Sequence, residues 1–188
     1  MKKILISCIC LLFSFGIASA LTDSREFAAA NFLAEKWVIK QFINASDYRL
    51  EDTITRKEVA KIVTKLAGVE PEEKCEGKFS DVAQDWGCKY IERMLKVGFI
   101  ANSKTYRPDD NITKSEAVKM IFKARGIEKK YSTGNWQQDY AKTAADLDLV
   151  DTYTDYGSDA LRGWIFRLAA RDFEEYKKEE SLISDEAL

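Results

Sequence analysis

Histidine is absent from the 188 residues of this chain, and proline occurs only twice. Without an imidazole, the chain cannot build a histidine-based catalytic triad, a histidine metal site or imidazole acid–base catalysis. These absences exclude several large classes of enzyme before any motif is considered.

Acidic residues are the next candidates for chemistry. Sequence neighbours such as Asp109 and Asp110 do not suit a glycosidase, which needs two carboxyl groups that face each other across a cleft. The acidic segment 151–162 does not fit an EF-hand, because Gly157 falls at position 7 instead of 6 and Arg162 replaces the final glutamate. We therefore expect no enzymatic activity, no catalytic residue, no metal and no cofactor.

Neither sign of charge dominates, since 29 Lys and Arg stand against 31 Asp and Glu. Such a mixed and slightly acidic balance argues against nucleic acid as a partner and against general adhesion to an anionic membrane.

A long apolar run occurs once, from Ile4 to Ile17, after Lys2 and Lys3 and before Ala18-Ser19-Ala20. This pattern predicts a secretory signal peptide over residues 1–20, with a lipoprotein signal ending at Cys8 as the alternative. No later run is long enough to cross a bilayer. We therefore expect an exported protein, extracellular or associated with the cell envelope, without a transmembrane segment in the mature chain.

Cysteine is scarce as well. Cys8 and Cys10 leave with the predicted signal, so the mature chain keeps Cys75 and Cys88. An even pair in an exported protein favours a disulfide, which the chain-entropy relation values at about 3 kcal/mol for a loop of this length. The alternative is two free thiols, and two cysteines alone cannot form a four-thiolate zinc site.

What the sequence does contain is an internal repeat. A shift of 58 residues aligns Asp47–Val69 with Thr105–Ile127 without a gap, and a weaker third copy aligns at shifts of 50 and 48. We therefore predict three units, at residues 21–70, 76–128 and 131–175. The charged tail at residues 176–188 should fray.

Each unit is predicted to be a helix, a loop and a second helix. The second helices of the first two units begin with capping boxes, Thr55 with Glu58 and Thr113 with Glu116. The third unit lacks this box, and we expect Ser158 or Asp159 to replace it as the cap. A helix pair of this size cannot bury its apolar stripe alone. The prediction is therefore an all-α fold, with three tandem helix–loop–helix repeats packed with pseudo-threefold symmetry around a shared three-helix bundle.

The second unit carries an ordered set of motifs in KFSDVAQDWGCKYIERMLKVGFIANSKTYRPDDNITKSEAVKMIFKARGI, residues 78–127. They are a Phe-x-Asp-Val start, a tryptophan seven residues later, a helix ending in Gly-Phe-Ile, a Tyr-x-Pro and an Ile-Thr-x-x-Glu helix. This unit resembles the S-layer homology domain. The first unit resembles it mainly in its second half, and the third is divergent but in register.

The resemblance implies a non-enzymatic module that attaches exported proteins to the cell envelope without a covalent bond. Its expected ligand is an acidic wall polysaccharide, for which pyruvate-bearing secondary polymers are the common example in this family, or a peptidoglycan-linked glycan. The alternative is an extracellular protein-interaction or assembly module that keeps the fold without binding glycan, with other envelope proteins as partners.

The resemblance also places an anionic sugar beside a basic residue in the grooves between units. That position is Arg56 in the first unit, Lys114 in the second and Arg162 in the third. A cation beside the free N–H groups of a helix start forms an anion site, whereas the alternative is three solvated surface cations. The third unit has no acid in the place of Glu58 and Glu116, which argues against a full groove around Arg162.

Tryptophans give a second set of candidates. Trp86 and Trp136 either stack on sugar faces or pack against the start of the first helices of their units. Trp37 aligns with Leu95 at the shift of 58, so we expect it in the core. Trp164 suits either role.

Overall fold

The computed structural model describes residues 24–173 and 176–178. The predicted signal peptide and most of the predicted tail lie outside these residues. The described part is all-helical, without a named strand, which confirms the predicted fold class. No helix within it has the length and apolar character needed to cross a membrane.

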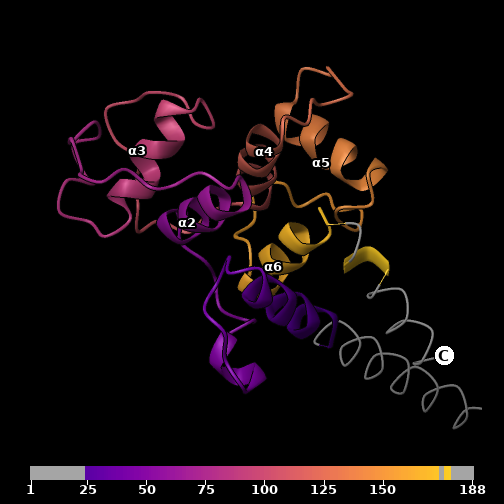
Figure 1. Cartoon of the computed structure of the whole chain (residues 1–188). Helices are drawn as coiled ribbons and strands as arrows, with labels where there is room; N and C mark the ends of the chain where they lie inside the picture. The colour runs from indigo at the N-terminus through magenta and orange to yellow at the C-terminus, as the bar shows by residue number, and fades with distance from the viewer. Residues whose placement is uncertain (1–23, 174–175, 179–188) are drawn as a thin grey trace, which may run out of the picture.

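Each predicted unit contributes two main helices. A helix at residues 24–35 and the short 3-10 helix η1 (Ala45–Tyr48) precede α2 (Arg56–Leu66). They are followed by α3 (Cys88–Lys96), α4 (Lys114–Arg125), α5 (Trp136–Asp146) and α6 (Arg162–Ala170). The helices α2, α4 and α6 gather at the centre, with α3, α5 and the first helix around them (Figure 1).

In two of the three units, the second helix begins with the capping box that the sequence predicts. The Thr55 amide donates to Glu58 at 2.9 Å, and the Thr113 amide donates to Glu116 at 3.1 Å, which forms the two capping boxes. The third expectation is wrong, because the N-cap of α6 is Leu161, without a side-chain cap. Instead, the first amides of α6 donate to backbone carbonyls of the first unit.

The three units are joined by a ring of backbone hydrogen bonds at the centre. Ile54 donates to Ala160 at 3.3 Å, Ala160 donates to Ile112 at 2.9 Å, and Ile112 donates back to Ile54 at 3.0 Å. All three residues are fully buried. A pseudo-threefold arrangement requires this cyclic order, although the symmetry itself stays a prediction.

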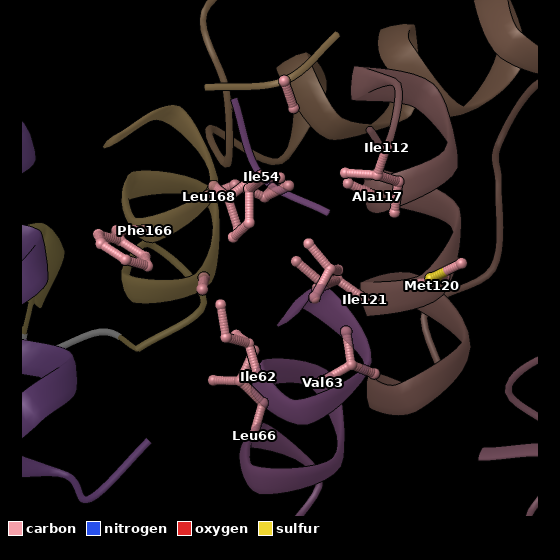
Figure 2. Packing of buried hydrophobic residues seen from close by; sticks show 14 of the residues in the cluster. Ile54, Ile62, Val63, Leu66, Ile112, Ala117, Met120, Ile121, Phe166 and Leu168 are labelled. Carbon is pink, nitrogen blue, oxygen red and sulfur yellow. The ribbon is translucent and has the colours of Figure 1, made fainter. Parts of the chain in front are cut away.

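Around this ring, the central helices share one apolar core. Figure 2 shows their side chains meeting beside Ile54 and Ile112. The labelled contributors are Ile62, Val63 and Leu66 of α2, Ala117, Met120 and Ile121 of α4, and Phe166 and Leu168 of α6. Burial of large aliphatic side chains is the dominant favourable term in folding, so the core holds the second helices in place.

Trp37 is not in the core, and its prediction is wrong. The Val38 amide donates a hydrogen bond to the Leu33 carbonyl, and the Phe99 amide donates an equivalent bond to the Met94 carbonyl, both at 2.9 Å. Trp37 is therefore equivalent to Gly98, at a shift of 61 instead of 58, and both have a positive φ, of 61° and 80°. The first unit has three extra residues before Tyr48, and Trp37 is 86% exposed at the end of its helix.

We expect Trp37→Gly to raise the free energy of unfolding by about 1 kcal/mol, because a bulky L-residue is strained at positive φ and glycine is not. Urea denaturation of the two proteins would measure the difference. Ile43→Ala is the control, since it removes an equally exposed apolar side chain without a positive φ and should change stability by less than about 0.5 kcal/mol. A glycine variant no more stable than the parent would contradict the assigned strain.

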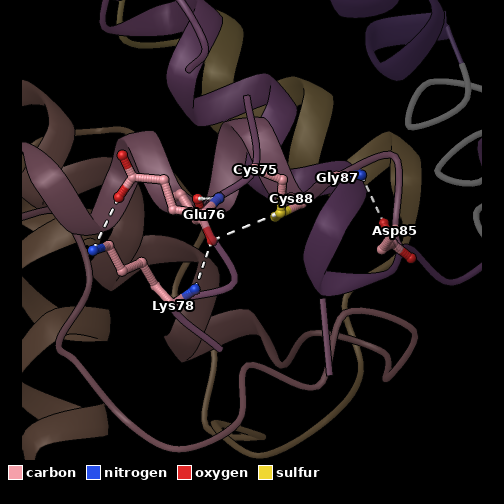
Figure 3. Close-up of a disulfide and its surroundings, with 7 residues drawn as sticks. Cys75, Glu76, Lys78, Asp85, Gly87 and Cys88 are labelled. Atoms are coloured by element: carbon pink, nitrogen blue, oxygen red, sulfur yellow. Dashed lines mark hydrogen bonds and ion pairs between the residues drawn. A yellow bond between two sulfur atoms is a disulfide. The ribbon is translucent and has the colours of Figure 1, made fainter. Parts of the chain in front are cut away.

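Cys75 and Cys88 form a disulfide, with their Cα atoms 5.8 Å apart, which confirms the predicted pairing (Figure 3). Buried Glu92 of α3 reinforces the same loop, because its carboxylate accepts hydrogen bonds from the amides of Glu76 at 2.6 Å and Lys78 at 2.7 Å. The segment before Phe79 is thereby attached to α3 both covalently and by hydrogen bonds.

The expectation that the tail frays is wrong at its first residue. Tyr176 is fully buried, its hydroxyl donates to the Arg25 carbonyl at 2.8 Å, and its ring centroid lies 5.3 Å from that of Phe32. The start of the tail therefore packs against the first helix.

Candidate ligand grooves between the units

Arg56 lies at the first position of α2, as expected, but its side chain reaches across to the second unit. Its Nη1 donates to Glu116 at 2.8 Å, and its Nε donates to the carbonyl of Tyr106 at 3.0 Å. The Tyr106 hydroxyl donates in return to the Arg56 carbonyl at 3.1 Å. Burial raises the pKa of Tyr106, so this phenol stays a neutral donor. Arg56 itself is 9% exposed.

Arg162 has the equivalent environment at the boundary between the third and first units. Its Nη1 donates to Glu58 at 2.7 Å, and its Nε donates to the carbonyl of Tyr48 at 3.1 Å. Tyr48 and Glu58 are the repeat partners of Tyr106 and Glu116. The two boundaries are therefore built from the same parts.

Lys114 lies in a different environment at the third boundary. Its Nζ pairs with Asp155 at 2.7 Å and lies over the rings of Tyr153 and Trp164, at 5.7 and 5.9 Å from their centroids. Trp164 occupies the repeat position of the missing glutamate. The structure therefore corrects the sequence argument, because this missing acid alters the surroundings of Lys114 and not those of Arg162.

The helix-start amides are engaged within the protein. The amide of Arg56 donates to Asp110 at 2.9 Å, and that of Lys57 donates to Pro108 at 3.1 Å. At α6 the amides of Arg162 and Gly163 donate to carbonyls of the first unit, both at 2.9 Å. The expected contribution of free helix amides to an anion site is therefore wrong at both helices, and side chains have to supply the positive charge.

A groove of about 850 Å³ opens beside Arg56, and we call it the Arg56 groove. Among the described residues that line it, one is acidic, Glu116, and four are cations. These cations are Arg56, Arg107, Lys119 and Lys123. An excess of positive charge therefore gathers in one groove of a chain whose net charge is −2.

Trp136 completes the Arg56 groove from the third unit. It is 39% exposed, its ring meets Tyr140 edge-on at 6.3 Å, and the Lys119 Nζ lies 4.9 Å from its centroid. The indole therefore packs at the start of α5 and also borders the groove, and its stacking on a sugar stays a prediction.

A second groove, of about 270 Å³, lies beside Arg162, and we call it the Arg162 groove. Trp86 borders it from the second unit, is 50% exposed and meets Tyr90 edge-on at 6.3 Å. The charged residues that line this groove are Lys40, Lys61, Arg162 and Glu58. It is therefore a smaller cationic groove with its own indole.

The capping glutamates have a second role that sequence reasoning missed. One carboxylate oxygen of Glu58 accepts from Thr55 in the capping box, and the other accepts from Arg162 of another unit. Burial opposes ionisation of Glu58, but the Thr55 amide and the Arg162 charge outweigh it and lower the pKa of the carboxyl below its ordinary value. Glu58 therefore stays ionised and links a helix start to the neighbouring unit.

Several groove cations were also missed, among them Arg107, Lys119, Lys123 and Lys61. Lys61 aligns with Lys119 at the same shift of 58 that pairs Arg56 with Lys114. A search of the sequence for every cation that recurs after 58 residues would have found Lys61 and Lys119.

A family model described as the S-layer homology domain matches residues 78–118. Three curated proteins are similar to the chain. The Middle cell wall protein of Brevibacillus brevis is 30% identical over 131 residues. Exoglucanase XynX of Acetivibrio thermocellus and Amylopullulanase of Thermoanaerobacterium thermosulfurigenes are each 27% identical over 135 residues. The alignments cover 65%, 63% and 63% of this chain but 12%, 12% and 7% of those proteins. Residues 78–118 therefore match the S-layer homology domain family, and three tandem domains stay a prediction.

Proposed function

We propose that the protein is a non-enzymatic module that attaches to the cell envelope by binding an anionic wall polysaccharide in its inter-unit grooves. The observation that carries the proposal is the Arg56 groove, which is lined by four cations and one carboxylate in a chain with more acid than base. The relatives support an attachment role. The chain aligns with only a small part of a cell wall protein and of two different enzymes, so the shared part is common to proteins with different activities.

The residues of the Arg56 groove have different roles in ligand binding. Glu116 already balances the charge of Arg56, so the exposed side chains of Lys119 and Lys123 supply the excess positive charge for an acidic sugar. The exposed part of Trp136 offers an apolar face on which a sugar ring packs. Arg56 and Tyr106 hold the floor of the groove through hydrogen bonds between the units.

The test is sedimentation of the purified protein with isolated cell walls. We expect Lys119→Ala with Lys123→Ala to weaken retention about tenfold, because two exposed charges together contribute about 1.4 kcal/mol. Walls stripped of their acidic polymer should retain little protein. The matched control is Lys74→Ala with Lys89→Ala, which removes the same charge from exposed positions outside both grooves. Retention that survives both stripping and the groove variant would overturn the proposal.

An extracellular protein-interaction module is the second candidate. The observation that favours it is the exposure of Trp37 and Ile43, at 86% and 93%, in the lengthened loop of the first unit. Large exposed apolar residues often mark sites of association. If this function holds, Trp37→Ala with Ile43→Ala abolishes retention by walls, whereas removal of the acidic polymer has no effect.

A further inference from the structure

We propose that Cys75, Cys88 and Glu92 form a zinc site when the disulfide between the two cysteines is reduced. Three ligand atoms, the two sulfurs and one carboxylate oxygen, all lie within 4.8 Å of one another. Zinc accepts thiolates and carboxylates in tetrahedral sites, where three protein ligands are commonly completed by one water molecule. The site is separate from the Arg56 and Arg162 grooves, because none of the three residues lines either of them.

The positions of the ligands on the backbone suit a single metal ion. Cys88 and Glu92 are four residues apart on α3, so their side chains lie one turn apart on the same face of the helix. Metalloproteases take two histidine ligands of zinc from one helix at this spacing. Cys75 supplies the third ligand from the loop before α3, and its Cα lies 5.8 Å from that of Cys88 (Figure 3).

The carboxylate of Glu92 is held by backbone hydrogen bonds that do not involve the disulfide. Its Oε1 accepts from the Lys78 amide at 2.7 Å, and its Oε2 accepts from the Glu76 amide at 2.6 Å. The same Oε1 lies 3.7 Å from the Cys75 Sγ. Because a carboxylate oxygen has two lone pairs, Oε1 can bind a metal ion and keep its amide partner. Such outer hydrogen bonds orient the ligands of metal sites.

A metal ion has a path to this carboxylate. A pocket of about 310 Å³ opens beside Glu92, which is itself 4% exposed. The charged residues that line this pocket are Glu72, Glu76, Glu92, Lys78 and Lys96. Acids outnumber bases in this lining, so no net positive charge opposes the entry of a cation.

The disulfide and the zinc site are alternative states of the same two sulfurs. A dithiol that reduces the Cys75–Cys88 bond gives it two electrons and two protons and becomes a disulfide itself. Zn²⁺ then binds both sulfurs, and the two thiol protons pass to the solvent. In the reverse direction the two sulfurs bond to each other, Zn²⁺ leaves, and an external disulfide takes up two electrons and two protons. In the reduced chain, zinc therefore replaces the disulfide as the link between the loop and α3.

The test is titration of the full chain with Co²⁺, which reports on the coordination of a zinc site through its absorption spectrum. The chain is reduced with a dithiol, separated from it and kept free of oxygen. We expect one Co²⁺ per chain, with a thiolate-to-cobalt charge-transfer band and the intense visible bands of tetrahedral coordination. Zn²⁺ should remove these bands by competition, and the oxidised chain should not produce them.

Variants separate the proposed site from binding by two thiols alone. Glu92→Gln keeps the size of the side chain and one acceptor oxygen, and we expect it to weaken the binding of Co²⁺ at least tenfold. The matched control is Glu76→Gln, because this glutamate is exposed and is not one of the three ligands. Its affinity should stay within twofold of that of the parent. Cys75→Ser with Cys88→Ser should abolish the charge-transfer band.

Stability gives a second readout. Zn²⁺ should raise the urea midpoint of the reduced parent and leave that of the oxidised parent unchanged. If the reduced chain unfolds without metal, the return of helical circular dichroism on addition of Zn²⁺ measures the same site. Equal affinity of Glu92→Gln and the parent would overturn the inference. Equal affinity of the reduced parent with and without denaturing urea would also overturn it, because unfolded thiols would then bind the metal as well as the folded chain does.

Discussion

Arg56→Ala should lower the free energy of unfolding by about 3 kcal/mol, although this residue lies at a candidate ligand site. The substitution removes a nearly buried guanidinium from Glu116 and from the carbonyl of Tyr106, which lie 2.8 and 3.0 Å from it. Breaking a buried ion pair from one side leaves the partner charge uncompensated and costs about 3–5 kcal/mol. The lower end applies because Glu116 keeps partial exposure and a second cation, Arg107, 3.5 Å away.

Chemical denaturation of a double-mutant cycle would check this prediction. Arg56→Ala, Glu116→Gln and the double variant should show strong non-additivity, because both single changes remove the same pair. Arg107→Ala is the control, since this exposed side chain contacts the same carboxylate and should contribute less than about 1 kcal/mol. Additive effects in the cycle would show that the pair is not coupled. Wall-binding losses in Arg56 variants have to be interpreted with this destabilisation in mind.

Loss of the disulfide should have an effect of similar size. Replacing Cys75 and Cys88 by serine, or reducing them, should lower the free energy of unfolding by about 3 kcal/mol, because the bond closes a loop with a sequence separation of 13 in the unfolded chain. The hydrogen bonds from Glu76 and Lys78 to Glu92 would then hold the loop without covalent help.

Denaturation with and without reductant would measure the effect of the bond. The doubly substituted protein is the control, because reductant should leave its unfolding midpoint unchanged. Equal midpoints for the oxidised and reduced parent would contradict the prediction.

The shared use of Glu58 and Glu116 connects stability to the candidate sites. Each glutamate closes a capping box with one oxygen and holds an arginine of another unit with the other. A substitution there would weaken a helix start and a unit boundary together. For this reason, Lys119 and Lys123 are better sites than Arg56 for testing ligand binding.

Features that depend on neighbouring residues could be predicted from the sequence. The helix α4 begins after Thr113, because the capping box of Thr113 with Glu116 acts over one helical turn. The disulfide pairing followed from the small number of cysteines. These predictions need no knowledge of how the units pack.

The first helix of the first unit shows where such reasoning fails. Alignment by side-chain identity placed Trp37 over Leu95, although its backbone has the left-handed conformation of Gly98. A tryptophan is disfavoured there locally. The register is selected by burial of Ala30 and Leu33, which the alignment did not weigh.

The sequence by itself determined the all-α class, both capping boxes, the disulfide and the repeated cation and tryptophan positions, because each depends on local spacing or on a repeat within the chain. Only the tertiary structure decided that Arg56 pairs with Glu116 and Arg162 with Glu58, and that Lys114 lies against Trp164. The physical reason is the direction in which the three units close their ring of hydrogen bonds. That direction brings the cation of one unit to the glutamate of another, and it is a property of the packed core.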